Sequence, residues 1–437
     1  MIRTLDARSL GLDAVVTALE RPPERVAADI HAAVEAIVAA VRERGDDALL
    51  ELTARFDRFD AGSASALAIA SDEMQAAESQ VADDVRDAIR YAADRIARYH
   101  AEAMPRSWRI TDEHGSVLGQ EVRPLDRVGI YVPGGRAAYP STVLMTAIPA
   151  RVAGVREIVL VTPPDANGRV LPTVLAAARA AGVTEAWRVG GAQAVAALAY
   201  GTKSIRRVDK IVGPGNIYVA LAKRRVFGDV GIDMVAGPSE VLVVADASAQ
   251  ADWIAADLLA QAEHDPMARA VLVTDAAPLI DATRAALARR LDALPRRAIA
   301  AEALEANGAL IQVGDLGEAA ELANRLAPEH LELYVREPGA LLPRIRHAGA
   351  IFLGGHTPEV VGDYVAGPNH VLPTGGTARF SSPLGTEDFV KRSSVIEYTA
   401  SGLAAALPHL RALARVEGLD AHARAAEARD PQGGEGP

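Results

Sequence analysis

The residues most capable of chemistry gather late in the chain, where seven of the ten histidines fall between positions 264 and 422. Glu329 and His330 stand side by side after Pro328, at an expected turn from a helix to a strand. Adjacent side chains point in different directions, so an imidazole that removes an alcohol proton and a carboxyl that activates water could serve two proton transfers in one site. The alternative, a solvated glutamate beside a packed histidine, stays open from these residues alone.

A second pair, Gln261 and His264, lies near the end of an expected apolar helix that stops at Pro266. A spacing of three places both side chains on one face of that helix. Two neutral donors of this kind could hold a zinc ion if further ligands arrive from elsewhere in the fold. The alternative is a hydrogen bond between the glutamine and the histidine at the helix end.

Two more residues could complete a metal site. Asp363 stands in an expected Gly-Asp-Tyr turn after an apolar strand, where a carboxylate could ligate a metal or hold an ammonium group. It could equally form an Asx turn with its own backbone. His422 lies on the last expected helix, where a histidine is more often a surface residue. The pattern alone does not bring these residues to Gln261 and His264.

The elements that must position these residues alternate between strands and helices from position 127 onward. Four β-branched runs, beginning at 127, 157, 185 and 210, are each followed by an Ala-rich helical stretch, which predicts a parallel sheet flanked by helices. A second α/β stretch covers 240–315. Glycine-rich turns lie at 133–135, 190–191 and 213–216. Two of them, the GGR turn at 134–136 and the GPGN turn at 213–216, could present backbone N–H groups to a phosphate, although neither is the G-x-G-x-x-G fingerprint.

The flanking segments are less regular. Residues 25–100 show helical periodicity, 362–392 is a long irregular stretch typical of a functional segment, and about 400–429 is helical again.

Composition excludes several classes of function. A net charge of −11 opposes binding to a nucleic acid backbone. No apolar run reaches the length that a bilayer crossing needs, and the first residues lack the apolar core of a signal peptide, so no membrane association and a cytoplasmic location are expected. The chain has no cysteine, which excludes disulfides, thiolate metal sites and a cysteine nucleophile.

Read together, extended blocks of this sequence resemble the histidinol dehydrogenase family over nearly the whole chain. The blocks are VGIYVPGGRAAYPSTVLM, VGGAQAVAALAYGT, VDKIVGPGNIYVALAKR, IDMVAGPSEVLVVAD, DLLAQAEHD, LAPEHLELY, AGAIFLG, GDYVAGPNHVLPTGGTARFSSPLG and EGLDAHARA.

The resemblance implies roles for individual residues, all of which match the residue types of the family. It implies that Glu329 and His330 are the catalytic pair and that zinc, one ion per subunit, is held by Gln261, His264, Asp363 and His422. The substrate L-histidinol would be bound at these four positions and at His330, Ser239, His370 and Glu417. NAD would be bound at Tyr131, Gln193 and Asn216.

The implied reaction oxidises L-histidinol to L-histidine through the aldehyde, with two NAD consumed per turnover. Without cysteine, the aldehyde must be oxidised through its hydrate. The implied assembly is a homodimer whose active sites are shared across the interface, with His422 reaching the partner subunit. Two rivals remain at this stage: a zinc hydrolase, which has no use for the strand–turn–helix units, and a non-catalytic binding protein.

The expected fold is α/β, with two Rossmann-like parallel-sheet domains that have helices on both faces. The expected parts are an N-terminal arm (1–25), a first α/β domain (26–130 with 240–380), a second, NAD-binding α/β domain (131–239), and a C-terminal helical extension that exchanges between subunits (381–437).

Overall fold

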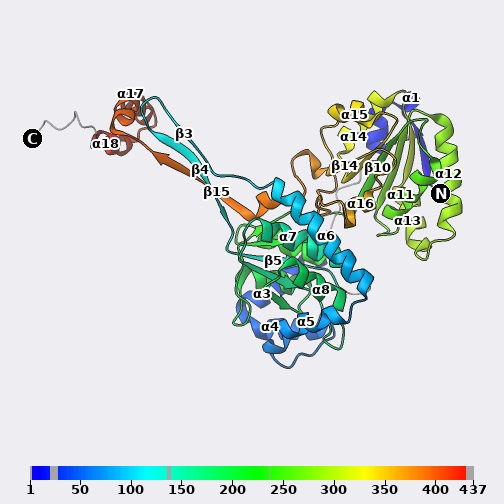
Figure 1. Cartoon of the computed structure of the whole chain (residues 1–437), viewed down its shortest axis with the longest axis horizontal. Helices are drawn as coiled ribbons and strands as arrows, with labels where there is room; N and C mark the ends of the chain where they lie inside the picture. The colour runs from blue at the N-terminus through cyan, green and yellow to red at the C-terminus, as the bar shows by residue number, and fades with distance from the viewer. Residues whose placement is uncertain (1, 20–27, 135–138, 236, 430–437) are drawn as a thin grey trace, which may run out of the picture. The chain divides into compact units, whose positions relative to one another are not determined.

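A computed structural model of the chain describes residues 2–19, 28–134, 139–235 and 237–429 (Figure 1). The chain divides into a larger unit, residues 1–103 and 125–389, and a smaller unit, residues 104–124 and 390–437. None of the helices in these described ranges has both the length and the apolar character that crossing a bilayer requires.

The first sheet of the larger unit has six parallel strands in the order β1-β12-β11-β10-β13-β14. Successive side chains of a strand point to opposite faces, so each face needs its own cover. Val241 and Val243 of β10 pack with α11, α12 and α13. Leu242 and Val244 pack on the other face with α2 and α14. The bounds are β1 Arg3–Asp6, β10 Glu240–Ala245, β11 Arg269–Thr274, β12 Ala309–Gln312, β13 His330–Tyr334, β14 Ala350–Leu353, α1 Ala7–Leu10, α2 Leu12–Leu19, α11 Ala251–Ala262, α12 Ala277–Leu291, α13 Arg297–Asn307, α14 Leu316–Leu326, α15 Pro338–Leu341 and α16 Glu359–Tyr364.

The second sheet has the order β2-β7-β6-β5-β8-β9, parallel except for β2, which runs antiparallel to β7. Its four predicted strand–turn–helix units are confirmed. Helices α3, α4, α9 and α10 share one core cluster with its strands, and α5, α6, α7 and α8 pack among themselves. The bounds are β2 Ala68–Ile69, β5 Arg127–Tyr131, β6 Glu157–Val161, β7 Glu185–Trp187, β8 Lys210–Val212, β9 Gly231–Ile232, α3 Ala28–Arg44, α4 Asp46–Phe56, α5 Ser71–Ser79, α6 Asp83–Glu102, α7 Pro140–Val152, α8 Pro172–Ala181, α9 Gly191–Tyr200 and α10 Ile217–Val226.

The fold class is therefore the predicted one, but two segments join a different sheet from the one expected. The sequence predicts that 26–130 belongs with 240–380, whereas α3 and α4 pack on the second sheet and β5 lies within it. The first residues, expected as a separate arm, supply the edge strand β1 to the first sheet. A helical pattern shows that a helix has an apolar face, but it does not show which sheet covers that face.

The smaller unit contains an antiparallel sheet in the order β15-β4-β3, followed by α17 and α18. The predicted C-terminal extension is helical at α17 and α18, but its residues 390–397 form a strand. All four residues of β3 are exposed and most of β15 is exposed, so neither shows the apolar alternation that reveals a half-buried strand. The bounds are β3 Trp108–Thr111, β4 Val117–Pro124, β15 Val390–Glu397, α17 Ala400–Val416 and α18 Asp420–Glu427.

Candidate active site

Glu329 and His330 lie at the amino-terminal end of β13, between β10 and β14. Helix α14 ends at Leu326, and its capping residue Ala327 adopts the left-handed conformation with φ 48°. Pro328 is followed by a bend at Glu329, and His330 is the first residue of β13, so the predicted turn from helix to strand is present. Both side chains are buried, which contradicts the alternative of a solvated glutamate.

One backbone residue, Glu240 at the start of β10, holds both side chains of the pair. Its amide donates to Oε2 of Glu329 at 2.8 Å, and its carbonyl oxygen lies 2.9 Å from Nδ1 of His330. A carbonyl can only accept, so Nδ1 carries the ring hydrogen and Nε2 keeps its lone pair. Nε2 is buried and has no hydrogen-bond partner in the described part of the chain. It is therefore the atom able to accept a proton from a substrate.

Burial sets the protonation states of the pair. Desolvation, assisted by nearby His264 and His370, lowers the pKa of His330 to about 4, so the ring is neutral near pH 7. Desolvation, together with the charges of Glu240 and Asp363, raises the pKa of Glu329 well above its usual value. A neutral imidazole and a carboxyl with a raised pKa are the forms that general base and acid–base chemistry need near neutrality.

Glu359 is a third titratable group at this site, and sequence reasoning missed it. It begins α16, is 1% exposed, and places Oε2 3.7 Å from Nδ1 of His330. Neither of its carboxyl oxygens has a hydrogen-bond partner among the described residues. Desolvation, followed by the charge of Glu332, raises its pKa well above the usual value. In the sequence it follows Pro358 and has the character of an ordinary first-turn acid, which hides its burial.

The candidate zinc ligands Gln261 and His264 lie together at the end of α11, as their spacing predicts. The side-chain nitrogen of Gln261 is 3.4 Å from Nδ1 of His264. The Gln261 amide oxygen is buried, with no hydrogen-bond partner within the described ranges. A buried carbonyl oxygen in this state can accept a cation or a donor from a ligand.

Asp363 approaches the same site from α16. The predicted turn at Asp363 is wrong, since residues 359–364 form the helix α16. Its Oδ1 is 3.8 Å from Nε2 of His330, and its backbone carbonyl accepts from Nδ1 of His370 at 3.0 Å. His264 also lowers the pKa of both His330 and His370, so the three imidazoles are electrostatic neighbours.

A complete metal centre is not assembled from these residues. Within the described residues, no group of three or more His, Asp or Glu side chains lies close enough to hold a metal ion. The donor types still fit zinc, which accepts imidazole nitrogen and carboxylate oxygen.

The remaining substrate positions lie in different parts of the chain. Ser239 is half-buried directly before β10, and its carbonyl accepts from the amide of Arg269. Glu417 and His422 belong to the smaller unit. Glu417 directly follows α17, His422 lies on α18, and both are exposed. The other candidates belong to the larger unit.

The candidate cofactor residues meet at the carboxyl edge of the second sheet. Tyr131 ends β5, is buried, and accepts a hydrogen bond from the amide of Gly191 at 3.1 Å. Gln193 is buried in the first turn of α9, and its amide nitrogen lies 3.5 Å from Oδ2 of Asp57. Asn216 caps α10 by accepting from the amides of the second and third helix residues. Ligands of open parallel sheets bind at this edge.

Sequence reasoning found the glycine-rich turn at 213–216 but missed two features near it, a buried ion pair and Asp57. Gly213 has φ +110°, and a Cβ there would lie 2.2 Å from the Tyr131 carbonyl oxygen, so only glycine fits. The turn is braced by a buried ion pair: Lys223 donates to the Gly213 carbonyl at 2.9 Å and pairs with Asp233, which accepts from the Gly213 amide at 2.8 Å.

Asp57 is the second missed residue at this edge. Desolvation raises its pKa to about 6, although the amide of Gly190 donates to it. It comes from the loop after α4, more than a hundred residues from Gln193. No local pattern could have placed it there.

Comparison with known proteins identifies the family. The family model for histidinol dehydrogenase matches residues 20–430. A histidinol dehydrogenase from Chromobacterium violaceum is 57% identical over 92% of each chain, and one from Geobacter sulfurreducens is 52% identical over 98% of this chain and 100% of its own. The crystal structure of histidinol dehydrogenase from Elizabethkingia anophelis superposes with a TM-score of 0.93, at 35% identity over 98% of both chains. The chain therefore belongs to the histidinol dehydrogenase family, whose members are oxidoreductases of histidine biosynthesis.

Proposed function

We propose that this chain oxidises L-histidinol to L-histidine in two steps that each transfer one hydride to NAD. The observation that supports this most directly is the buried imidazole of His330. Its Nδ1 hydrogen is committed to the Glu240 carbonyl, and its low pKa keeps the ring neutral. The free Nε2 is then a base of fixed orientation, which is what alcohol oxidation requires.

In the first step, Nε2 of His330 takes the hydroxyl proton while the carbon-bound hydrogen leaves as hydride, and the alcohol becomes an aldehyde. NAD supplies the hydride acceptor when it is bound. The positive ring that forms has Asp363 on the Nε2 side and Glu359 on the Nδ1 side, at 3.8 and 3.7 Å. Either carboxylate, when ionised, stabilises that charge in the buried site.

In the second step, water must add to the aldehyde, because the chain has no cysteine to form a thiohemiacetal. Glu329 takes a proton from the attacking water, and its raised pKa makes it a stronger base when ionised. His330 gives its first proton to the aldehyde oxygen, which completes the hydrate, and the neutral ring then takes a hydroxyl proton of the hydrate as the second hydride leaves. The product is the carboxylic acid, and four electrons have been transferred in total.

We further propose that one zinc ion per subunit is held by Gln261, His264, Asp363 and His422 of the partner subunit. The orphaned, buried amide oxygen of Gln261 supports this ligand set. Bound zinc would orient the imidazole and amine of histidinol, a contribution of positioning more than of bond making. Ser239, His370 and Glu417 would complete the substrate contacts.

The surface of the smaller unit supports a homodimer. Its strands and helices expose large apolar side chains, including Ile396 at 69%, Leu413 at 65% and Val416 at 86%. Exposed apolar side chains gathered on one small unit are typical of a protein–protein interface. This unit also contains Glu417 and His422, so its docking on a partner would bring both to the second active site.

For NAD we propose the carboxyl edge of the second sheet, with Tyr131, Gln193 and Asn216 in contact with the cofactor. The turn at Gly213 precedes the amino terminus of α10, where the helix dipole favours a phosphate.

A coupled assay tests the proposal. We expect two NADH per histidinol consumed, loss of activity after chelation, and recovery with Zn²⁺. Turnover without NAD would overturn the dehydrogenase function. Mixed dimers of His422→Ala and His330→Asn should regain activity in the one site that is intact; the absence of such complementation would contradict a shared site.

A further inference from the structure

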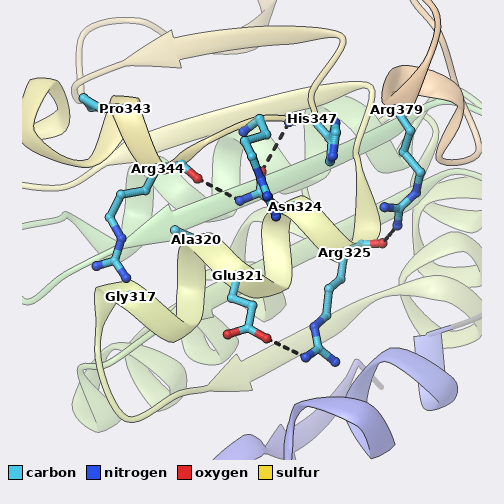
Figure 2. A pocket seen from close by; sticks show the side chains of 10 residues that line it. Gly317, Ala320, Glu321, Asn324, Arg325, Pro343, Arg344, His347 and Arg379 are labelled. Atoms are coloured by element: carbon cyan, nitrogen blue, oxygen red, sulfur yellow. Dashed lines mark hydrogen bonds and ion pairs between the residues drawn. The ribbon is translucent and has the colours of Figure 1, made fainter.

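A cavity of about 530 Å³ opens in the larger unit beside α14, away from the residues assigned above. Figure 2 shows its lining, with Arg344 over the amino-terminal part of the helix and Arg325 and Arg379 near its carboxyl-terminal end. Four arginines and one histidine face one glutamate in this cavity: Arg325, Arg344, Arg346, Arg379, His347 and Glu321. Such an excess of positive charge stands out in a chain with a net charge of −11.

The wall of the cavity is built and held by a buried side chain. Asn324 is 6% exposed, and its amide nitrogen donates to the Arg344 carbonyl at 2.8 Å. Its amide oxygen accepts from the backbone amides of Arg346 and His347 at 2.6 and 3.2 Å (Figure 2). These three bonds fix the shape of segment 344–347, so the arginines are presented from a defined backbone.

The positive charges of the cavity are only partly neutralised. Arg325 pairs with Asp13 and Glu321. The guanidinium of Arg379 donates to the carbonyl of Arg325, which does not cancel its charge. Within the ranges that the structure describes, Arg344 and Arg346 form no ion pair. Arg344 lies over Gly317, where a Cβ would stand 2.7 Å from its guanidinium.

We infer that this cavity binds a phosphate-bearing anion. Guanidinium groups match phosphate through two parallel hydrogen bonds, and they keep their charge at any physiological pH. The cavity has room for a phosphate and more, with charged groups converging from α14, from segment 344–347 and from the loop of Arg379.

The location connects the cavity with the catalytic pair. Arg325 stands four residues before Glu329, at the end of α14. Segment 344–347 leads to Gly349 and Ala350, whose amides donate to the carbonyls of Pro328 and Glu329 at 2.9 and 2.8 Å. An anion that bridges the two groups of arginines therefore clamps both chain segments that support the pair.

Calorimetric titration of the full-length enzyme with orthophosphate, pyrophosphate and AMP at low ionic strength tests the inference. We expect saturable binding of one anion per chain when saturating NAD fills the proposed cofactor site. Arg344→Ala/Arg346→Ala should weaken it by about tenfold or more, because two bidentate contacts are lost. Arg344→Lys/Arg346→Lys keeps the charge but loses the paired N–H groups of the guanidinium, so its affinity for the anion should lie between those of the wild type and the alanine variant. Arg98→Ala/Arg224→Ala, a matched control on exposed arginines elsewhere, should change it by less than about twofold.

The outcomes separate the alternatives. Equal binding of orthophosphate and AMP means that the phosphate group alone is recognised, and tighter binding of AMP means a nucleotide; both support the inference. No saturable binding of any probe, or equal weakening by the two alanine pairs, would overturn it. A rise in the KM for NAD of Arg344→Ala/Arg346→Ala would assign these arginines to the cofactor instead. Binding that leaves hydrogen exchange unchanged in 323–331 and 344–350 would contradict the clamp.

Discussion

The two six-stranded sheets of the larger unit place their candidate functional residues at opposite ends of their strands. At the first sheet these residues lie at the amino end of β13 and β10, where Glu329, His330 and Glu359 are buried and have shifted pKa values. At the second sheet they lie at the carboxyl ends of β5 and β8, where a glycine turn leads into the capped amino terminus of α10. The second arrangement is the usual one for open α/β sheets.

The difference follows from what each edge must do. Proton transfer needs side chains whose pKa values are moved by burial, and burial depends on what packs above them. Holding a dinucleotide needs backbone groups in a fixed turn, which short-range sequence determines. We therefore expect changes at the first edge to alter kcat and its pH dependence, and changes at the second to alter the KM for NAD.

The sharpest test of the first edge is His330→Asn. Loss of the only free ring nitrogen in the pair should lower kcat by about 10²- to 10⁴-fold, the range for a general base. Steady-state kinetics measures this, and a melting curve checks that the protein is folded. A loss of less than tenfold with the fold intact would remove His330 from the role of base.

Glu329→Gln should lower kcat by about a hundredfold, with the larger part in the second step. The amide cannot take a proton from water, so histidinaldehyde should be consumed more slowly than histidinol is oxidised. Single-turnover measurements with each substrate separate the steps. Equal slowing of both would assign Glu329 to a role common to the two oxidations.

At the second edge, Lys223→Met should raise the KM for NAD by about tenfold while kcat changes little. Breaking the pair leaves Asp233 buried and uncompensated, which should lower stability by about 3–5 kcal/mol. The double variant Lys223→Met/Asp233→Leu should recover stability without restoring the KM, because the Gly213 turn stays unbraced. A large fall in kcat with unchanged KM would break the comparison between the edges.

Glu359→Gln should have the smallest effect, about a few-fold on kcat, and the effect should grow with pH. Because the pKa of Glu359 is raised, its carboxyl is neutral at low pH and stabilises a protonated His330 only when ionised at higher pH. A ratio of wild-type to variant kcat that does not change with pH would contradict this.

The pH dependence of the stability of the chelated protein tests the raised pKa of Glu359 independently of activity. A carboxyl with a raised folded pKa contributes stability that is complete below its unfolded pKa and is lost as pH rises through the folded value. The glutamine variant lacks this loss, so its melting temperature relative to wild type should rise with pH.

Much of the second sheet could be predicted because short stretches of sequence are enough to indicate its strands and helices. Most strands of its four strand–turn–helix units are short apolar runs, and helices α7, α9 and α10 each follow a glycine-rich turn within a few residues. The packing of α3 and α4, and the strands β3 and β15, could not be predicted. The packing of α3 and α4 depends on contacts between segments that are distant in the sequence. Strands β3 and β15 show no apolar alternation because they are mostly exposed.

The sequence by itself determined the family, the fold class and the residue types available for chemistry, because ordered blocks and hydrophobic periodicity are local properties of the chain. It also required an aldehyde route without cysteine. Only the tertiary structure decided which nitrogen of His330 is free, because that depends on the Glu240 carbonyl 90 residues away. It likewise decided that Glu359 and Asp363 face this ring, because burial and long-range packing, not spacing, bring them there.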